Sequence, residues 1–197
     1  MSLMRLSEAA RAIPAELRGE DCVFETVSTD TRTLAPRTLF VALKGERFDG
    51  HDFLGEAAAK HAAGALVQKA GSRIEEQGLS DRLPLLVVED TKKSLGTLAA
   101  YWRKKFSLPL VALTGSNGKT TVKQMLSAIC ARRGPVLATV GNLNNHIGVP
   151  LTLLALSPSH RFAVIEMGAN HPGEIAALAA IAEPAIALVT NAGDEHL

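Results

Sequence analysis

The sequence has 197 residues, 47% apolar and 21% charged, with a formal net charge of +1. This composition excludes a disordered chain and fits one large or two small globular domains. The near-zero charge gives no general attraction to nucleic acid or to an anionic membrane. Cys22 and Cys130 lie too far apart in sequence for a disulfide framework, no apolar run is long enough to span a bilayer, and no secretory signal is present. We therefore expect a cytoplasmic protein without membrane insertion.

In the first half of the chain, short strand patterns alternate with helical ones. The predicted helices cover residues 6–13, with Ser7 as the expected cap, and 52–63. The predicted strands cover residues 22–27, 39–43, 65–67 and 85–88. A further helix follows Asp90, a suitable N-cap. Its apolar face consists of Leu95, Leu98, Ala99, Trp102 and Phe106. We interpret it as the joint between a first domain, residues 1–90, and a second domain, residues 91–197.

The second half repeats a strand–helix unit. Predicted strands cover residues 110–113, 136–138, 162–165 and 186–189, and predicted helices follow at 122 onward, around Pro150 and at 173–182. Repeated βα units favour a doubly wound parallel sheet, in which ligands bind beyond the carboxyl ends of the strands. The predicted fold is therefore α/β, a small α/β domain followed by a doubly wound one. Because the chain stops soon after a predicted core strand, we expect a truncated second domain.

The turn after the strand at 110–113 has the features of a phosphate-binding loop. It comprises Gly115, Ser116, Asn117, Gly118, Lys119, Thr120 and Thr121. Backbone N–H groups at such a turn and helix N-terminus face an anion, the lysine reaches the outer phosphates, and the Thr120 hydroxyl can ligate Mg²⁺. The usual first glycine is replaced by Leu113, so a plain turn with a chance Gly-Lys-Thr is the alternative. The apolar face predicted for the following helix consists of Val122, Met125, Leu126, Ile129 and Cys130.

Other polar groups follow strands of the same predicted sheet. Glu166 directly follows an apolar strand and could hold Mg²⁺ beside Thr120, or could simply be a solvated acid. His196 follows another strand, but a lone histidine is more often an ordinary polar residue. Residues 142–146, rich in asparagine, are either a turn or amide groups for a polar substrate.

In the first half, two polar loops could grip a second anion. Their candidate residues are Thr29, Thr31, Arg32, Lys44 and Arg47, with Phe48 as an apolar face. Charged loops are usually only solvated, so this signal is weak by itself.

The motifs as a set resemble one enzyme family across essentially the whole chain. TGSNGKTT is similar to the ATP loop of the Mur ligases, amide-bond-forming enzymes of peptidoglycan precursor synthesis, whose loop also lacks the first glycine. GNLNNHIGVPLTLL and VIEMGANHPGEI resemble the member that joins D-Ala-D-Ala to UDP-N-acetylmuramoyl-tripeptide. STDTR, LFVALKG and DGHDF are shared in kind with the member that adds the third peptide residue.

The resemblance implies a role for each matching residue. Residues 115–121 would hold the ATP phosphates, and Lys119, Glu166 and His196 would be catalytic. Thr120 and Glu166 would hold one Mg²⁺, and His196 would help to hold a second. The muramoyl peptide would face Asn142, Asn144 and Asn145. The UDP end would contact Thr29, Thr31, Glu46, Arg47 and Phe48. The family's modified lysine, most adenine contacts and a third domain would lie beyond Leu197.

The implied reaction is ATP-dependent formation of an amide bond through an acyl phosphate, by a monomeric enzyme with ATP and Mg²⁺ as cofactors. Three alternatives stay open on the residues. The chain could belong to the ligase that adds the third peptide residue. It could be another P-loop enzyme, such as a kinase or a folate-type ligase. It could also be a non-catalytic module that binds a UDP-sugar or nucleotide, and we expect the 197-residue chain alone to be inactive.

Overall fold

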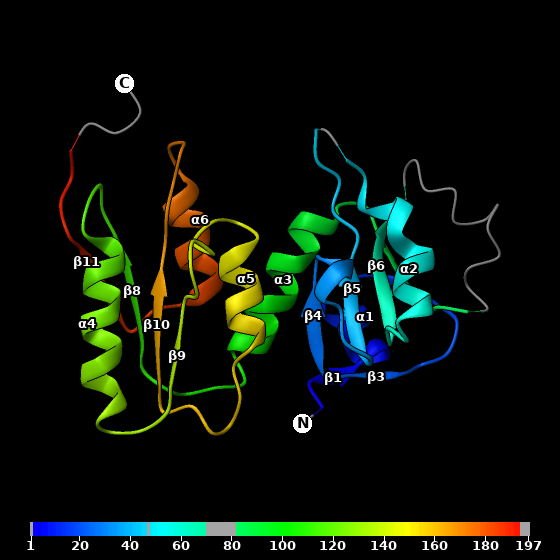
Figure 1. The fold of residues 1–197 in the computed structure, drawn as a ribbon, viewed down its shortest axis with the longest axis horizontal. Coiled ribbons are helices and arrows are strands. Elements are labelled where there is room, and N and C mark those ends of the chain that lie inside the picture. The colour runs from blue at the N-terminus through cyan, green and yellow to red at the C-terminus, as the bar shows by residue number, and fades with distance from the viewer. Residues whose placement is uncertain (1, 47, 70–81, 194–197) are drawn as a thin grey trace. The chain divides into compact units, whose positions relative to one another are not determined.

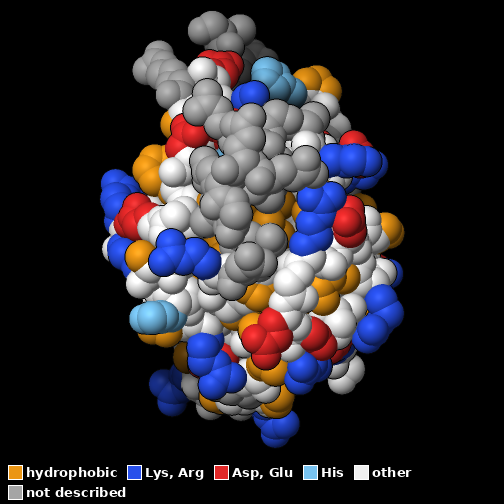
Figure 2. All heavy atoms as spheres, turned by 90° about the vertical axis from the view of Figure 1, so that its right-hand side faces the viewer, with side chains coloured by type: hydrophobic (Ala, Val, Ile, Leu, Met, Phe, Trp, Pro, Cys, Tyr) orange, Lys and Arg blue, Asp and Glu red, His pale blue; other side chains and the backbone are white. Residues whose placement is uncertain are grey.

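The structure, a computed structural model, describes residues 2–46, 48–69 and 82–193 (Figure 1). The chain divides into two compact units, Met1–Leu98 and Ala99–Leu197. The division falls inside helix α3 (Thr91–Arg103), whereas the predicted domain boundary lies at residue 90. Among the described residues, no helix combines the length and the apolar character needed to cross a membrane. On the face shown in Figure 2, Lys and Arg side chains are interspersed with Asp and Glu, as the small net charge indicates.

A five-stranded sheet of order β2-β7-β6-β5-β4 forms the centre of the first unit. Its strands are β2 (Glu16–Arg18), β4 (Thr26–Ser28), β5 (Thr38–Val41), β6 (Gly64–Gln68) and β7 (Leu85–Val88). Only β2 runs antiparallel to its neighbour, and a separate ribbon pairs β1 (Met4–Arg5) with β3 (Val23–Phe24). The central strands are buried along almost their whole length, as expected for parallel strands covered on both faces.

The helices of the first unit match the sequence expectation at residue 6 but not at residues 52–63, where a 3-10 turn precedes a shorter α-helix. They are α1 (Leu6–Ala12), the 3-10 turns η1 (Thr31–Thr33) and η2 (Gly50–Phe53), and α2 (Leu54–Ala59). The prediction that Ser7 caps the first helix is wrong, because Arg5 occupies the cap position without a side-chain cap bond. Instead, Asp21 accepts from the Ser7 N–H (2.9 Å) and hydroxyl (2.8 Å) and pairs with Arg5 (2.8 Å). A carboxylate that is distant in the sequence thus accepts a hydrogen bond from a backbone N–H group in the first turn of α1.

A four-stranded, fully parallel sheet of order β11-β8-β10-β9 forms the second unit. Its strands are β8 (Leu110–Thr114), β9 (Val136–Ala138), β10 (Phe162–Glu166) and β11 (Ile186–Val189), and its helices are α4 (Lys119–Ala131), α5 (Gly148–Leu154) and α6 (Glu174–Ala182). The connection from β8 through α4 leads to β9, toward one edge of the sheet. The connections from β9 through α5 to β10 and from β10 through α6 to β11 lead toward the other edge. Right-handed crossovers therefore place α4 on one face and α5 and α6 on the opposite face. The predicted α/β fold class, with its parallel sheets, is confirmed.

The apolar face predicted for α4 is wrong in part. Met125 and Ile129 are 60% and 65% exposed, whereas Lys123 is buried. The helix packs on β8, β9 and β10 with its N-terminal turns close to the end of β10, where a buried carboxylate provides a partner for the lysine. The covered face of α4 therefore includes a lysine that pairs with a carboxylate at the sheet edge, in addition to apolar residues.

Candidate functional site at the carboxyl edge of the second sheet

The turn between β8 and α4 requires glycine at two positions. Gly115 has a φ of +135°, and a Cβ there would lie 2.1 Å from the Thr190 hydroxyl oxygen. Gly118 has a φ of +79° and directly precedes the first residue of α4. Such backbone conformations are strained for residues with a side chain. The two glycines thus let the chain turn tightly from strand into helix, which places the N-terminus of a 13-residue helix at the sheet edge.

The segment that follows β11 braces this turn. The Asn117 N–H donates to Asn191 Oδ1 (2.9 Å), and the Ser116 N–H donates to the Asn191 carbonyl (3.1 Å). The Thr190 hydroxyl donates to the Asn117 carbonyl (2.7 Å), and the Gly193 N–H donates to Ser116 Oγ (2.8 Å). Because β11 and β8 are neighbours in the sheet, the ends of both strands meet here. These four hydrogen bonds hold the loop against the segment after β11.

The Lys119 side chain folds back over the loop. Its ammonium donates to the carbonyls of Gly115 and Ser116, the latter at 3.0 Å. The first N–H groups of α4 have no acceptor within the helix, and the helix dipole adds partial positive charge at this end. The ammonium and the helix N-terminus together form a site suited to a phosphate group.

Glu166 lies at the end of β10, and the residue as a whole is 2% exposed. Its Oε2 accepts from the Thr120 hydroxyl (3.1 Å) and lies 3.3 Å from Lys123 Nζ, while its Oε1 accepts from Asn144 Nδ2 (2.9 Å). The Glu166 N–H donates to the hydroxyl of Thr139, just after β9 (2.9 Å). Contacts from α4 and from Asn144 therefore hold the carboxylate, and Thr139 holds the backbone of the same residue, so Glu166 is not the solvated acid that the sequence left open.

The loop rich in asparagine borders a polar pocket of about 370 Å³ at the same edge. The pocket is lined by Lys119, Asn142, Asn144, Asn145, His146, Gly168, Ala169, Asn170 and Glu174. Glu174 accepts from the N–H groups of Asn170 and His171, and these bonds hold the pKa of its carboxyl below the usual value. The pocket thus combines a cation, an anion and several amides, a suitable lining for a polar and charged substrate.

Two of the asparagines are already engaged within the protein. Asn145 Oδ1 accepts from the N–H groups of Ile147 (3.0 Å) and Gly148 (2.9 Å) at the start of α5, and the Asn144 amide binds Glu166. Asn142 and His146 also line the pocket, and both residues are exposed. The loop is therefore a turn that also forms one wall of the pocket.

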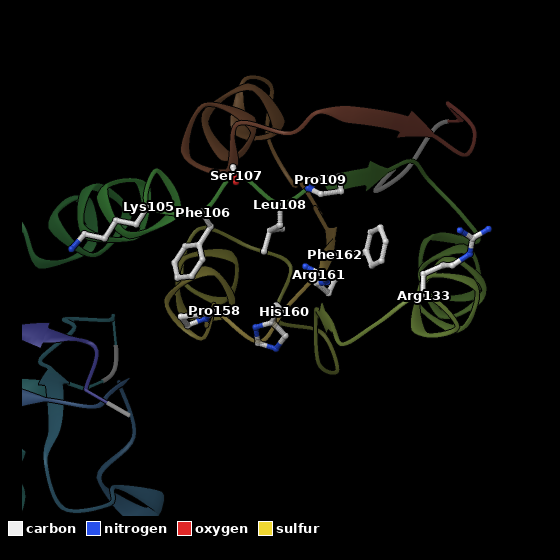
Figure 3. Close-up of a pocket in the computed structure, with 10 residues that line it drawn as sticks. All are labelled: Lys105, Phe106, Ser107, Leu108, Pro109, Arg133, Pro158, His160, Arg161 and Phe162. Carbon is white, nitrogen blue, oxygen red and sulfur yellow. The ribbon is translucent and has the colours of Figure 1, made fainter.

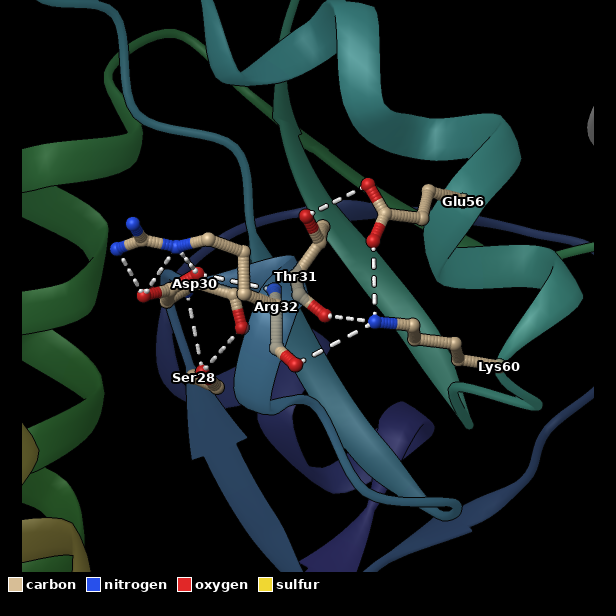
Figure 4. A network of polar contacts seen from close by, with 6 residues as sticks. All are labelled: Ser28, Asp30, Thr31, Arg32, Glu56 and Lys60. Atoms are coloured by element: carbon tan, nitrogen blue, oxygen red, sulfur yellow. Dashed lines mark hydrogen bonds and ion pairs between the residues drawn. The ribbon is translucent and has the colours of Figure 1, made fainter.

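The candidate residues of the first unit lie in two separate loops. The Thr31 hydroxyl donates to Glu56 Oε2 (2.9 Å), and Lys60 Nζ donates to the Thr31 carbonyl (2.6 Å), as Figure 4 shows. Arg32 pairs with Asp30 (2.7 Å) in the same network. Thr29 is half-buried, whereas Glu46 and Phe48 are exposed. The predicted roles of Arg47 and His196 fall outside the described residues.

A larger pocket, of about 630 Å³, lies at the opposite edge of the second sheet (Figure 3). Pro109 and Phe162 border it where β8 and β10 begin, and Lys105, Arg133 and Arg161 line it. Ligands of parallel α/β sheets bind at the carboxyl ends of the strands. We therefore place the functional site at the phosphate loop despite the smaller pocket there.

The motifs and this geometry agree with comparisons to known proteins. A sequence model described as "Mur ligase family, catalytic domain" matches residues 23–103, and one described as "Mur ligase middle domain" matches residues 113–197. The chain belongs to the Mur ligase family. It is 48% identical over 197 residues to a UDP-N-acetylmuramoyl-tripeptide–D-alanyl-D-alanine ligase of Escherichia coli K12. It is 37% identical over 196 residues to the protein of the same name from Bacillus subtilis 168.

Solved structures of Mur ligases share the fold. A MurF structure from Acinetobacter baumannii superposes with a TM-score of 0.88 at 37% identity, covering 100% of this chain and 42% of that one. MurF from Thermotoga maritima in complex with ADP gives a TM-score of 0.72 at 35% identity over 84% of this chain and 37% of that one. The E. coli and B. subtilis alignments each cover 100% of this chain but 42% of the relative. The chain thus spans about two fifths of the length of the Mur ligases it matches.

Sequence reasoning missed some residues of this site. Lys123 follows Thr120 by three positions, one helical turn, so the spacing was a usable signal. The spacing does not single this residue out by itself, because lysines on helices are usually solvated. Thr139 directly follows a predicted strand and could have been noticed for the same reason as Glu166. The bracing by Thr190 and Asn191 depends on strand order, which the sequence does not give.

Proposed function

We propose that this chain carries the ATP-phosphate site and the UDP-substrate region of a ligase that joins D-Ala-D-Ala to UDP-N-acetylmuramoyl-tripeptide. The observation that carries the proposal is the Thr120 hydroxyl 3.1 Å from the buried Glu166 carboxylate, directly after a phosphate loop. The printed names of the relatives support the substrates, and the ADP complex of the Thermotoga maritima relative supports the nucleotide.

The donor set suits Mg²⁺. Thr120 and Glu166 offer a hydroxyl and a carboxylate oxygen, the hard ligands that this ion takes beside phosphates. When bound there, the ion would neutralise charge on the phosphate oxygens. We further propose that His196 contributes to a second Mg²⁺.

The chain's own residues position and neutralise the reacting phosphates. The Lys119 ammonium, which contacts the carbonyls of Gly115 and Ser116, would turn to the outer phosphates of ATP. The N–H groups at the N-terminus of α4 would donate hydrogen bonds to the phosphates. A terminal carboxylate oxygen of the tripeptide would attack the γ-phosphorus, giving an acyl phosphate and ADP. The amine of D-Ala-D-Ala would then attack the acyl carbon, lose a proton and release phosphate. In-line positioning and charge stabilisation supply most of the rate in such reactions.

The substrate would bind along the pocket beside Lys119. Asn142 and His146 would contact the muramoyl peptide directly, whereas Asn144 would act through Glu166 and Asn145 through the start of α5. The UDP end would contact Thr29, Thr31, Glu46, Arg47 and Phe48. We propose a monomeric, cytoplasmic enzyme.

A three-substrate assay tests this function in a full-length ligase carrying this sequence. ATP, UDP-N-acetylmuramoyl-tripeptide and D-Ala-D-Ala are combined, and the product is identified by mass spectrometry. We expect a UDP-muramoyl-pentapeptide together with one ADP per product. A parallel reaction offers the UDP-muramoyl-dipeptide with diaminopimelate or lysine. Product only in that second reaction would assign the enzyme to third-residue addition, and no ADP in either would favour a binding module.

A further inference from the structure

Lys123 is a buried lysine at the proposed metal position. Its side chain is 6% exposed and that of Glu166 is 3% exposed, with Nζ and Oε2 3.3 Å apart. Lysine is almost never buried unless it is paired. The oxygen that it pairs with is the one that also accepts from the Thr120 hydroxyl. The carboxylate proposed to bind Mg²⁺ therefore already has a positive partner within the protein.

The charges around this carboxylate disfavour a bare divalent cation. The Glu166 carboxylate has Lys123 against it, and Lys119 lies about one helical turn before Lys123 in α4. Within residues 2–46, 48–69 and 82–193, no three His, Cys, Asp or Glu side chains are grouped to hold a metal ion. Glu174, on the adjoining pocket wall, accepts from the N–H groups of Asn170 and His171. A bound nucleotide would make the local charge at this position more negative, because its phosphates bring several negative charges.

We propose that Lys123 is a counter-ion built into the metal position. It holds the Glu166 carboxylate toward Thr120 before metal binds, and it repels a divalent cation that arrives without phosphates, so that the cation binds together with the nucleotide. The proposal rests on the proposed function in taking Thr120 and Glu166 as the metal position. At a separation of a few ångströms, the repulsion between an ammonium and a divalent ion is large enough to change affinity by about tenfold or more.

Binding of Mn²⁺ to this chain, followed by the electron paramagnetic resonance signal of the free ion, tests the proposal directly. Lys123→Met removes the charge and keeps an unbranched chain, and Lys123→Arg keeps the charge. Without nucleotide, we expect Lys123→Met to bind Mn²⁺ at least about tenfold more tightly than the wild type, and Lys123→Arg to match the wild type. Lys104→Met is the control, because Lys104 pairs with Glu183 (3.3 Å) on the surface of the same unit. Equal or weaker Mn²⁺ binding by Lys123→Met would overturn the proposal.

A second readout covers the case in which Lys123→Met does not fold. Lys123→Gln still donates a hydrogen bond to Glu166 without the charge, and Mg²⁺ should raise its unfolding temperature while leaving that of the wild type unchanged. A purely structural lysine would lower the unfolding temperature of the variant with no response to Mg²⁺, which contradicts the proposal. The wild type is also titrated with ADP and Mg²⁺. No nucleotide binding by the wild type, combined with tighter Mn²⁺ binding by Lys123→Met, would support the counter-ion and count against the proposed function.

Discussion

The Thr120 hydroxyl and the Glu166 carboxylate lie 3.1 Å apart, although 46 positions separate them in the sequence. Parallel pairing of β8 and β10 brings them together, because Glu166 is in register with Leu113, just before the phosphate loop. The loop then turns through Gly115 and Gly118, so that the first residues of α4 return to the end of β10. These two side chains, each of which offers an oxygen atom as a metal ligand at the edge of a parallel sheet, are the structural basis of the proposed metal position.

Gly115→Ala tests whether the tight turn is essential. The added Cβ would lie 2.1 Å from Thr190 Oγ1 and 2.8 Å from the Asn191 carbonyl, so the loop or its brace must shift. Gly173→Ala is the matched control, because Gly173 also has a positive φ (+88°) but a Cβ there meets no atom within 4 Å. We expect the control to lose about 1–2 kcal/mol of unfolding free energy from backbone strain alone, and Gly115→Ala to lose more. Fluorescence of Trp102, the single tryptophan, reports unfolding of the second unit. Equal losses in the two variants would contradict the close packing at Gly115.

Asn191 should affect nucleotide affinity without touching the nucleotide. Asn191→Ala removes the acceptor of the Asn117 N–H, and losing one such hydrogen bond costs about 1 kcal/mol. We expect ADP binding to weaken by about fivefold, measured by titration calorimetry. Asn191→Asp keeps the acceptor and should keep the unfolding temperature, but its added negative charge should still weaken ADP binding. An Asn191→Ala variant with unchanged ADP affinity would show that the brace has no part in the site.

Two neighbouring asparagines should have separable effects. Asn145→Ala removes the acceptor for two N–H groups at the start of α5, so we expect a loss of about 1 kcal/mol in unfolding free energy. Asn145→Asp keeps the acceptor and should restore most of that stability. Asn144→Ala instead removes a donor to Glu166, so it should alter metal and nucleotide binding more than Asn145→Asp does. Identical binding defects in Asn144→Ala and Asn145→Asp would contradict this division of roles.

The stability of the first unit should depend on Asp21 in acid. Hydrogen bonds from Arg5 and Ser7 lower the pKa of this carboxyl from 3.8 to about 2 in the folded protein. Its contribution is therefore fully present above the unfolded pKa near 4 and is lost as the pH falls toward 2. We expect the stability difference between wild type and Asp21→Asn, followed by circular dichroism, to shrink as the pH falls from 5 to 2.

Asp30→Asn is the comparison for this pH dependence. The pKa of Asp30 is also lowered to about 2, by Arg32, but the two residues are only two positions apart. A local pair of this kind persists in part when the chain unfolds, so the folded and unfolded pKa values differ less. The pH-dependent difference should therefore be smaller for Asp30→Asn than for Asp21→Asn. The opposite order would show that Asp21 does not link β1 and α1 as the structure indicates.

The sequence predicted most of the fold because its signals are local. The strands at β7, β9 and β11 have the predicted bounds, and the glycine-rich turn between β8 and α4 was visible in the motif itself. The short strands β1 and β2 were missed, because two or three residues carry no detectable alternation.

The candidate site was predictable only where a residue directly followed a strand. Glu166 was found in that way. Lys123 was not, because its burial depends on a carboxylate 43 positions away and overrides the usual solvation of a helical lysine. Such non-local pairings are decided by strand order, which periodicity alone does not give.

Trapping of the acyl phosphate tests the central claim most directly. A full-length ligase carrying this sequence is mixed with ATP and UDP-N-acetylmuramoyl-tripeptide without D-Ala-D-Ala, and hydroxylamine is added to convert any acyl phosphate to a hydroxamate. We predict ADP and a hydroxamate of the tripeptide with the wild type and with the surface control Lys104→Ala, and neither product with Lys119→Ala. ADP and hydroxamate at near-normal levels from Lys119→Ala, or no hydroxamate from an active wild type, would contradict the account.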